Sequence, residues 1–311
     1  MTTSIPPEDA VLPPPTLEEV SPGAYAYIQP DGSWCLNNTG LLVDRRGVTV
    51  IDTCATEARS RAFLEAAARV SDAPLSTLVS THHHGDHTYG NWLLPAATII
   101  GHERCRAEVL AGGLGTTAAF PTVDFGRIEI APPFVTFEDR LRIWVDDSPV
   151  DLLYMGPAHT TNDVVAWVPE RRLLFTGDLV FNGGTPFVLM GTVMGWLRAL
   201  GRLRALAPAT IVPGHGPVCG PEVLDEVESY LRFVQEVAGE AAAAGASPLE
   251  AARSCDLGPF APWHDRERLV GNLHRALSEV RGEPEATPLD YPAIWMEMVE
   301  FNGGLPLRCL A

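Results

Sequence analysis

Residues 81–87 read Thr-His-His-His-Gly-Asp-His, which places three imidazoles and a carboxylate in the pattern HxHxDH directly after a predicted strand. Alternate residues of an extended segment face the same way, so His82 and His84 can share one metal ion. Asp86 and His87 follow a glycine and can turn toward a second metal ion. A surface histidine tract that binds metal adventitiously is the alternative, but the aspartate interrupts the tract. The stretch therefore predicts a metal centre.

Three later side chains add to this prediction. His159 occurs in Gly-Pro-Ala-His-Thr, Asp178 in Phe-Thr-Gly-Asp and His215 in Val-Pro-Gly-His-Gly, each just beyond a predicted strand. Ligands gather in such loops in α/β architectures, because the sheet fixes each loop and brings distant parts of the sequence together. A single histidine or turn aspartate is more often structural, but three in the same context predict further metal ligands.

Short strands and helices alternate along the chain in two blocks. The expected strands are Leu41–Val43, Val48–Ile51, Leu75–Ser80, Phe134–Phe137, Arg140–Val145, Val150–Met155, Val164–Val168, Arg172–Thr176 and Thr210–Val212. The expected helices are Glu57–Val70, Trp196–Leu206 and three stretches from Pro221 onward. Strand blocks flanked by helices in both halves favour a layered α/β arrangement in which one sheet packs on another. Because no internal linker is visible, we expect a single domain at 21–311 after an extended, proline-rich lead-in at 1–20.

The composition disfavours several classes of protein. With 39 Asp and Glu against 22 Lys and Arg, the formal net charge of −17 disfavours binding to a nucleic-acid backbone. Nowhere does the sequence offer the roughly 18 consecutive apolar residues that a membrane-spanning helix needs. The first twenty residues lack the positive charge and the apolar run of a secretion signal. We therefore expect a cytoplasmic protein with neither nucleic-acid nor membrane partners.

The seven ligand-type residues, in their order along the chain, resemble the signature of the metallo-β-lactamase superfamily: HxHxDH, then a His, an Asp or Cys, and a final His. The resemblance implies a four-layer αββα sandwich (the metallo-β-lactamase fold), here with extra C-terminal helices. The implied ligands are, for the first metal ion, His82, His84 and His159; for the second, Asp86, His87 and His215; and, bridging both, Asp178.

Two further roles follow from the resemblance. Asp86 and His215 are expected to act in catalysis as well as in metal binding. Asp52, in the stretch Val-Ile-Asp-Thr that matches the family's early strand, is expected to support the cluster from behind its ligands. A cap at the end of a strand is the alternative role for this aspartate.

The chemistry explains why these residue types are needed. Imidazoles and carboxylates suit Zn²⁺, and also Fe²⁺ or Mn²⁺. Two metal ions roughly 3.5–4 Å apart can share one hydroxide, and water bound to them acquires a pKa of about 7. A metal ion can also polarise a carbonyl and stabilise the oxyanion that develops. The predicted cofactors are two divalent metal ions, with zinc first, and the reaction needs no serine or cysteine nucleophile.

The residue at the bridging position bears on the substrate. Antibiotic-degrading members of the superfamily carry Cys in the region where this chain has Asp178, and the pattern is more similar to the glyoxalase-II-like and thioesterase branches, which hydrolyse thioesters. A narrower resemblance, to the cyclase-thioesterases of bacterial type II aromatic polyketide pathways, rests on five segments. They are Asn91–Leu94, Phe125–Glu129, Pro132–Phe137, Gly183–Phe187 and Val299–Gly304.

This narrower resemblance implies an enzyme that closes a ring of a polyketide tethered to an acyl carrier protein and hydrolyses the thioester. A metal-dependent thioesterase acting on a small-molecule acyl thioester is the second interpretation. The polyketide, the ring that is closed, the order of the two steps and the oligomeric state do not follow from the sequence.

Candidate substrate contacts lie in two places. The apolar residues that follow the bridging aspartate are expected to line a pocket for a flat ring, with a helix core stripe as the alternative; they are Phe187, Met190 and Met194. The early hairpin contributes three more, with turn or strand-edge roles as the alternative: Trp34, Asn37 and Asn38. The remaining histidines are expected to have no chemical role: His83, His102, His264 and His274.

Other classes of protein remain as alternatives. Seven such ligands can also hold iron in a di-iron redox protein, but those usually depend on a flavin domain and no flavodoxin-like phosphate loop is visible. A metal-dependent nuclease is disfavoured by the acidic balance. A noncatalytic binding module is disfavoured because every ligand is retained.

Overall fold

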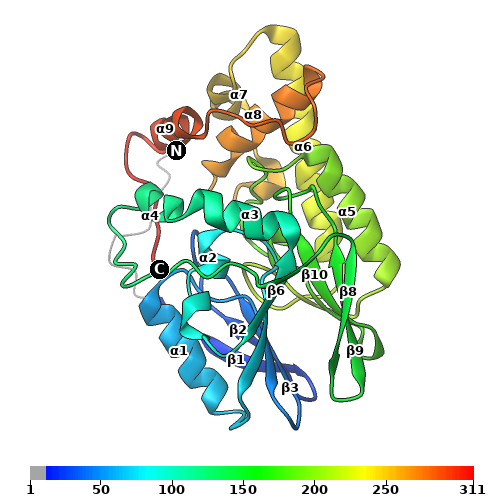
Figure 1. Ribbon diagram of the computed structural model, residues 1–311. Coiled ribbons are helices and arrows are strands. Elements are labelled where there is room, and N and C mark those ends of the chain that lie inside the picture. The colour runs from blue at the N-terminus through cyan, green and yellow to red at the C-terminus, as the bar shows by residue number, and fades with distance from the viewer. Residues whose placement is uncertain (1–11) are drawn as a thin grey trace.

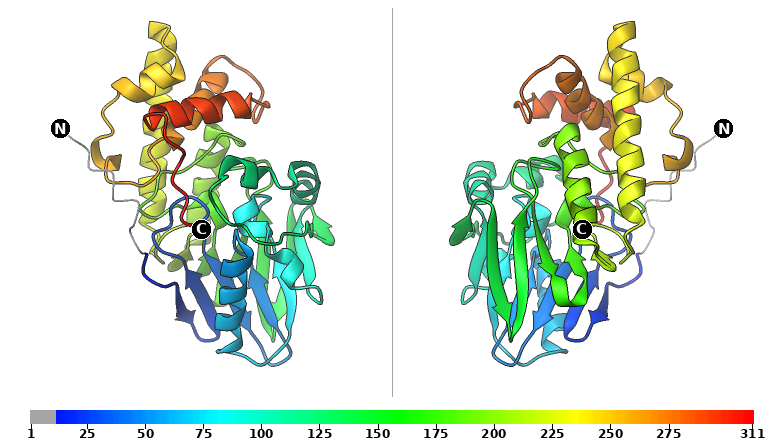
Figure 2. Two further views of the ribbon diagram at one scale, coloured as in Figure 1. Left: turned by 90° about the vertical axis from the view of Figure 1, so that its left-hand side faces the viewer. Right: turned by 90° about the vertical axis from the view of Figure 1, so that its right-hand side faces the viewer.

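The computed structural model describes residues 12–311, and within this range two β-sheets pack face to face between outer layers of helices (Figure 1). The expected αββα arrangement with additional C-terminal helices is confirmed. Figure 2 shows from two sides that the strands occupy the lower part of the molecule and that the C-terminal helices gather above them.

The first sheet has seven strands in sequence order. Its first half is an antiparallel meander and its second half is parallel. In the hairpin between the third and fourth strands, the Asp44 carboxylate accepts hydrogen bonds from the backbone N–H groups of Arg46 and Gly47, which fixes the turn. The strands are β1 (Thr16–Ser21), β2 (Ala24–Ile28), β3 (Thr39–Val43), β4 (Val48–Ile51), β5 (Leu75–Val79), β6 (Thr98–His102) and β7 (Val135–Phe137).

The second sheet has five strands in the order β12-β11-β10-β9-β8. Its strands pair antiparallel except for β11 and β12, which are parallel and are connected through helix α5 (Val193–Leu206). The strands are β8 (Arg140–Val145), β9 (Ser148–Tyr154), β10 (Val164–Val168), β11 (Leu173–Phe175) and β12 (Thr210–Val212).

One hydrophobic cluster fills the space between the two sheets. The first sheet contributes Val79 and Ile100, and the second contributes Leu152 and Phe175. The sheets approach closely at Gly40, where a Cβ atom would lie 2.5 Å from the Phe175 ring. This packing fixes the sheets relative to each other, and with them the loops that leave their strand ends.

Helix α1 (Glu57–Ala68) covers the outer face of the first sheet. It begins after Thr56, whose side chain accepts a hydrogen bond from a backbone N–H of the first turn. On its buried face Phe63 packs in one cluster with Leu78 of the sheet. The helix therefore covers an apolar surface that the first sheet would otherwise expose to water.

Four α-helices follow the second sheet, one more than the sequence suggested. Helix α6 ends at Gly245 in a left-handed conformation with φ of 68°, and Ser247 then starts α7 through a capping box with Glu250. None of the helices in residues 12–311 is both long and apolar enough to cross a membrane. The four helices are α6 (Val223–Ala244), α7 (Pro248–Ser254), α8 (Arg268–Val280) and α9 (Tyr291–Phe301).

Strands β1, β2 and β6, and the two helices that follow β6, were not among the elements expected from the sequence. Strand β6 leads into α3 (Glu103–Gly112), which is followed by α4 (Gly115–Ala119). The buried residues of these two helices are Cys105 and Val109. Helices with so small a buried face carry little apolar periodicity, which is why the sequence pattern does not reveal them.

The proline-rich stretch at 1–20 divides into two parts. Residues 1–11 lie outside the described range. Strand β1 begins at Thr16 and pairs with β2, so the last residues of the expected lead-in belong to the first sheet.

Candidate metal centre

The predicted ligands and Asp52 all lie just beyond strand ends or in a loop between two strands. Asp52 follows β4, and the HxHxDH stretch follows β5 and runs into the short helix α2 (Gly85–Thr88). His159 lies between β9 and β10, Asp178 follows β11, and His215 follows β12. Ligands that are up to 133 residues apart in sequence, at 82 and 215, therefore meet because the two sheets deliver their loops to one place.

The seven predicted ligands form two adjoining groups. In each group, one ligand atom from every member lies within 4.8 Å of the others. The first cluster consists of His82, His84, His159 and Asp178, and the second cluster consists of Asp86, His87 and His215.

Asp178 lies between the two clusters. Its Oδ2 atom is 3.4 Å from Nε2 of His159 in the first cluster and 3.5 Å from Nε2 of His215 in the second. Its Oδ1 atom is 3.1 Å from Nε2 of His87. One carboxylate is thus close to histidines of both clusters, as a bridging ligand must be.

Three ligand atoms are buried and make no hydrogen bond to any residue in the range 12–311. They are Nε2 of His82, Nε2 of His87 and Oδ1 of Asp178. Buried polar atoms without a partner are costly, and a cation would satisfy all three. Imidazole nitrogen and carboxylate oxygen are also the donors that Zn²⁺ takes in proteins. The residues therefore fit two divalent metal ions.

The charge states of His82, His84 and Asp86 suit metal binding. Burial lowers the pKa of His82 and of His84, so both imidazoles are neutral donors. Burial alone would raise the pKa of Asp86, but the neighbouring His87 and His215 outweigh it and lower the pKa to about 2. The second cluster therefore presents an ionised carboxylate.

Asp52 lies behind the second cluster. Its Oδ2 atom accepts a hydrogen bond from Nδ1 of His87 at 2.8 Å, which leaves Nε2 facing the cluster. The same carboxylate accepts from the backbone N–H of Thr81 and from its hydroxyl, each at 2.7 Å. The hydroxyl in turn lies 3.1 Å from Nδ1 of His82. One carboxylate thus orients a ligand in each cluster.

Backbone carbonyls orient two further ligands. Nδ1 of His215 donates to the carbonyl of Gly32 at 3.0 Å, and Nδ1 of His159 donates to the carbonyl of Phe187. Because Nδ1 carries a proton in each ring, Nε2 is the nitrogen left to bind a metal ion, and it faces the metal centre.

Asp163 is a buried carboxylate of the site that was not expected from the sequence. It accepts hydrogen bonds from the backbone N–H of Ala158 at 3.1 Å and from the hydroxyl of Thr160 at 2.7 Å. These contacts fix the turn that carries His159. The spacing of Thr160 and Asp163 is that of a side-chain-capped turn, which is the signal that could have revealed it.

The three candidates on the early hairpin lie in the protein interior. Asn37 donates to the carbonyl of Thr53 at 2.7 Å, and Asn38 donates to that of Pro213 at 3.0 Å. The Trp34 ring is packed against other aromatic rings. The polar groups of both asparagines thus hold backbone, which agrees with the alternative of a turn or strand-edge role, and contact with substrate stays a prediction.

The three candidates after the bridging aspartate lie in different environments. Phe187 is buried and supplies the carbonyl that orients a ligand. Met190 has its sulfur 3.4 Å from Nε2 of His84. Met194 is 45% exposed in the first turn of α5. Of these three, Met190 lines the cavity described next.

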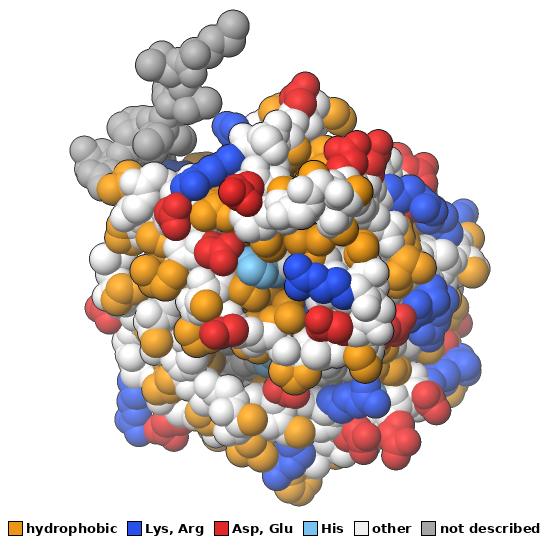
Figure 3. Space-filling view, turned by 90° about the horizontal axis from the view of Figure 1, so that it is seen from above, with side chains coloured by type: hydrophobic (Ala, Val, Ile, Leu, Met, Phe, Trp, Pro, Cys, Tyr) orange, Lys and Arg blue, Asp and Glu red, His pale blue; other side chains and the backbone are white. Residues whose placement is uncertain are grey.

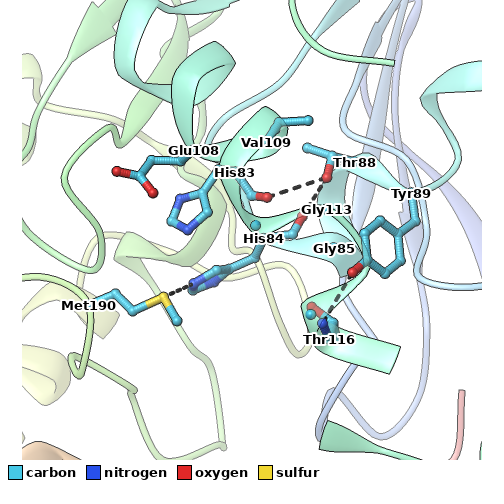
Figure 4. Close-up of a pocket in the computed structure, with 12 residues that line it drawn as sticks. His83, His84, Gly85, Thr88, Tyr89, Glu108, Val109, Gly113, Thr116 and Met190 are labelled. Atoms are coloured by element: carbon cyan, nitrogen blue, oxygen red, sulfur yellow. Dashed lines mark hydrogen bonds between the residues drawn. The ribbon is translucent and has the colours of Figure 1, made fainter. Parts of the chain in front are cut away.

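A cavity of about 130 Å³ adjoins the first cluster (Figure 4). His84 belongs to both, because its Nδ1 lies 3.0 Å from Nε2 of His159 while its Nε2 faces Met190. Figure 3 shows a histidine side chain near the middle of the face above the sheets, with hydrophobic groups above and below it and acidic and basic groups on either side. The lining residues are His83, His84, Gly85, Thr88, Tyr89, Glu108, Val109, Gly112, Gly113, Gly115, Thr116 and Met190.

Residues 32–215 match the family model of the metallo-beta-lactamase superfamily. The match covers more than half of the chain and contains all seven residues of the two clusters. The chain therefore belongs to the metallo-beta-lactamase superfamily, and it is a metal-dependent hydrolase of that superfamily.

Curated relatives fall into several kinds. The chain is 27% identical over 245 residues to the hydroxyacylglutathione hydrolase of Brucella anthropi, covering 71% of this chain and 83% of that protein. It is 23% identical over 226 residues to the metallo-beta-lactamase type 2 of Bacteroides fragilis, covering 70% and 85%. It is 29% identical over 178 residues to the alpha subunit of the 2,4-dinitroanisole O-demethylase of a Nocardioides species, covering 54% of this chain but only 49% of that subunit.

A solved structure agrees with the fold. The metallo-beta-lactamase from Pontibacter korlensis superposes with a TM-score of 0.57 at 19% identity, covering 70% of this chain and 99% of that one.

Proposed function

We propose that this protein hydrolyses an acyl thioester whose acyl group is bulky and largely apolar. The observation that carries the proposal is the meeting of seven ligand side chains in two clusters, bridged by Asp178 and bordered by a cavity. Relatives named hydroxyacylglutathione hydrolase recur among the similar proteins, which supports an acyl thioester as the substrate.

The residues around the centre define the chemistry available. Two divalent cations, proposed to be zinc, would supply Lewis acidity and lower the pKa of water. His82, His84 and His159 would hold the first by nitrogen, and the ionised carboxylate of Asp86 would help to hold the second. A thiolate leaves without a strong general acid, because the parent thiol has a pKa near 8.5. The site therefore needs no additional proton donor to release a thiol.

The cavity is suited to the acyl group. Its outer wall carries three glycines, Gly112, Gly113 and Gly115, and a Cβ atom added to any of them would meet no other atom within 4 Å. Backbone without side chains leaves a flat wall that a ring can approach closely. Met190, on the side of the metal ligand, has an unbranched side chain that adapts to the shape of its neighbour.

Two polar groups at the cavity distinguish it from a purely hydrophobic pocket. Nδ1 of His83 lies 3.0 Å from the side-chain amide of Asn162, so its Nε2 is the protonated nitrogen. Glu108 lines the same cavity and lies close to His83 (Figure 4). A donor and an acceptor at one place suit an acyl group that carries hydroxyl or keto oxygens.

In its finer form, the proposal is that the acyl group is an aromatic polyketide tethered to an acyl carrier protein, with ring closure as well as thioester hydrolysis at this centre. Five sequence segments support it. One of them, Gly183–Phe187, ends at the residue whose carbonyl orients His159. The cavity has a flat wall beside a hydrogen-bond donor and an acceptor. These features are consistent with an aromatic ring that carries oxygen atoms.

The experiment compares thiol release from two thioesters of N-acetylcysteamine, one with a hydroxynaphthoyl group and one with an acetyl group. Metal-loaded protein is expected to hydrolyse the aromatic thioester faster, and chelation should abolish the activity. Asp178→Asn should lose it too, whereas Asp72→Asn, at an exposed position, should not. Hydrolysis that survives chelation, or the absence of hydrolysis by metal-loaded protein, would overturn the proposal.

Hydrolysis of a β-lactam amide is a second candidate, favoured by the similarity to the Bacteroides fragilis and Pontibacter korlensis enzymes. A chromogenic cephalosporin assayed beside the thioesters decides between them. Turnover of the cephalosporin at a kcat/KM above that of the aromatic thioester would favour the β-lactam.

A further inference from the structure

Helix α8 carries a row of three buried polar side chains. Arg268, Asn272 and Arg275 follow one another at intervals of four and three residues, which places them on one face of the helix. Their exposed fractions are 1%, 0% and 0%. Buried polar and charged groups are costly unless they are hydrogen-bonded, so the partners of this row define its role.

The row binds the backbone of one loop. Arg268 donates to the carbonyl of Thr185 at 2.9 Å, Asn272 to that of Pro186 at 2.8 Å, and Arg275 to that of Leu189 at 2.8 Å. The backbone N–H of Val188 donates to the side-chain oxygen of Asn272 at 2.9 Å. Together with a second bond from Arg275 to the Leu189 carbonyl, of 3.3 Å, five hydrogen bonds hold residues 185–189 against α8.

The same loop touches two ligands of the first cluster. Between the carbonyls that α8 binds, the carbonyl of Phe187 accepts the hydrogen bond from Nδ1 of His159. One residue beyond the bound segment, the sulfur of Met190 lies 3.4 Å from Nε2 of His84. The position of this loop therefore sets the orientation of both imidazoles.

A second path leads from α8 to the other cluster. The guanidinium of Arg268 lies between two aromatic rings, 4.0 Å from the centre of Trp34 and 5.2 Å from that of Phe181. The Phe181 ring stacks on the imidazole of His215, with centres 5.1 Å apart and planes inclined by 10°. Arg268 thus supports a ligand of the second cluster through one intervening ring.

We propose that Arg268, Asn272 and Arg275 are positioning residues of the metal centre that act through residues 185–190. All three lie beyond residues 32–215, the part of the chain that matches the superfamily. The C-terminal helices of this protein are therefore part of the metal-binding apparatus as well as of its hydrophobic core. The proposal concerns metal binding and does not depend on the substrate.

The test compares two substitutions on the same helix. Asn272→Ala removes the two hydrogen bonds that Asn272 makes with the loop. His274→Ala removes the hydrogen bond of 2.9 Å between His274 and Glu297 of α9 and leaves the loop untouched. The affinity for each of two Co²⁺ equivalents is measured by competition with a chromophoric chelator, together with the visible spectrum of the bound cobalt and the stability to urea.

Asn272→Ala is expected to weaken one Co²⁺ equivalent by about tenfold and to change the cobalt spectrum, because partners behind metal ligands typically have effects of this size. His274→Ala should change neither, even if it lowers stability. Equal loss of affinity in the two variants, or an unchanged cobalt spectrum in Asn272→Ala, would overturn the proposal.

Arg275 provides a second pair of variants that keeps the test decisive if Asn272→Ala does not fold. Arg275→Met retains the packing of the side chain but not its hydrogen bonds, and Arg275→Lys retains one donor. We expect weaker Co²⁺ binding in Arg275→Met and partial recovery in Arg275→Lys. Wild-type affinity and spectrum in Arg275→Met would contradict the proposal.

Discussion

The carboxylate of Asp52 lies 2.8 Å from Nδ1 of His87, on the side of the imidazole opposite the metal centre. The carboxylate therefore selects the tautomer that leaves Nε2 free to bind a metal ion. Because Asp52 also receives two hydrogen bonds from Thr81, it is itself held rigidly at the end of β4.

Replacing this carboxylate should weaken metal binding. We expect Asp52→Asn to reduce the affinity of the second cluster by about 10- to 100-fold, because the amide is uncharged and can present a donor to the imidazole. Isothermal titration of the metal-free protein with Zn²⁺ measures the effect, with Asp72→Asn as the control. Affinity within a factor of two of the wild type would show that Asp52 is only a cap at the end of a strand.

A methyl group at Gly214 should disrupt the bridge between the clusters. A Cβ atom at this position would lie 2.0 Å from Oδ1 of Asp178 and 2.6 Å from the carbonyl carbon of Gly177. We expect Gly214→Ala to lose metal and about 1–3 kcal/mol of stability.

The control is Gly239→Ala, within the C-terminal part of α6, where a Cβ atom meets nothing within 4 Å. It should raise stability by up to about 1 kcal/mol. Urea unfolding and metal analysis of both variants provide the comparison. Full metal content in Gly214→Ala would show that metal binding does not require Asp178 at its observed position.

The width of the cavity should control which thioesters are accepted. Gly115→Leu places a side chain on the cavity wall, whereas Ala118→Leu adds the same side chain at an exposed position of α4 that does not line the cavity. We expect Gly115→Leu to lower kcat/KM for the hydroxynaphthoyl thioester by about tenfold and to leave the acetyl thioester unchanged. A parallel decrease for both thioesters would argue against the cavity as the acyl site.

The stability of the second sheet should depend on acid pH through Asp151. Hydrogen bonds from Arg142 lower the pKa of this carboxyl, burial opposes them, and Arg140 adds to the lowering. Since the folded pKa lies below the unfolded value of about 3.9, the ion pairs stabilise the fold above that pH and are lost as the pH falls through the folded value.

Asp151→Asn tests this dependence. The two arginine side chains are 53% and 43% exposed, so the pairs contribute about 1 kcal/mol or less at neutral pH. Urea unfolding from pH 7 to pH 2.5 should show a difference between wild type and variant that shrinks below pH 4. A difference that stays constant with pH would assign the effect to packing.

The parts of the site that were predictable are those encoded by local sequence. The HxHxDH stretch is contiguous, and His159, Asp178 and His215 each follow a strand and a glycine or proline that marks the strand end. Buried strands such as Val164–Val168 and Thr210–Val212 were found with their bounds, because an apolar run between turn residues is a local signal.

The parts that were missed depend on tertiary placement. The polar row of α8 acts on a loop that is about 85 residues earlier in the sequence, and nothing local connects the two. Asn37 and Asn38 of the early hairpin hold backbone just beyond other strand ends, and the local sequence does not show which backbone groups they bind. Part of the cavity wall consists of glycines, whose contribution is the space they leave.

The stoichiometry of bound metal tests the central claim most directly. Purified protein is stripped with a chelator, reloaded, and measured by plasma emission spectroscopy beside Asp178→Asn, with a visible spectrum to distinguish zinc from iron. We predict two equivalents of a divalent transition metal per wild-type chain, fewer in Asp178→Asn, and thioesterase activity that returns with the second equivalent. Folded wild-type protein that holds fewer than two equivalents of every transition metal tested would contradict the account.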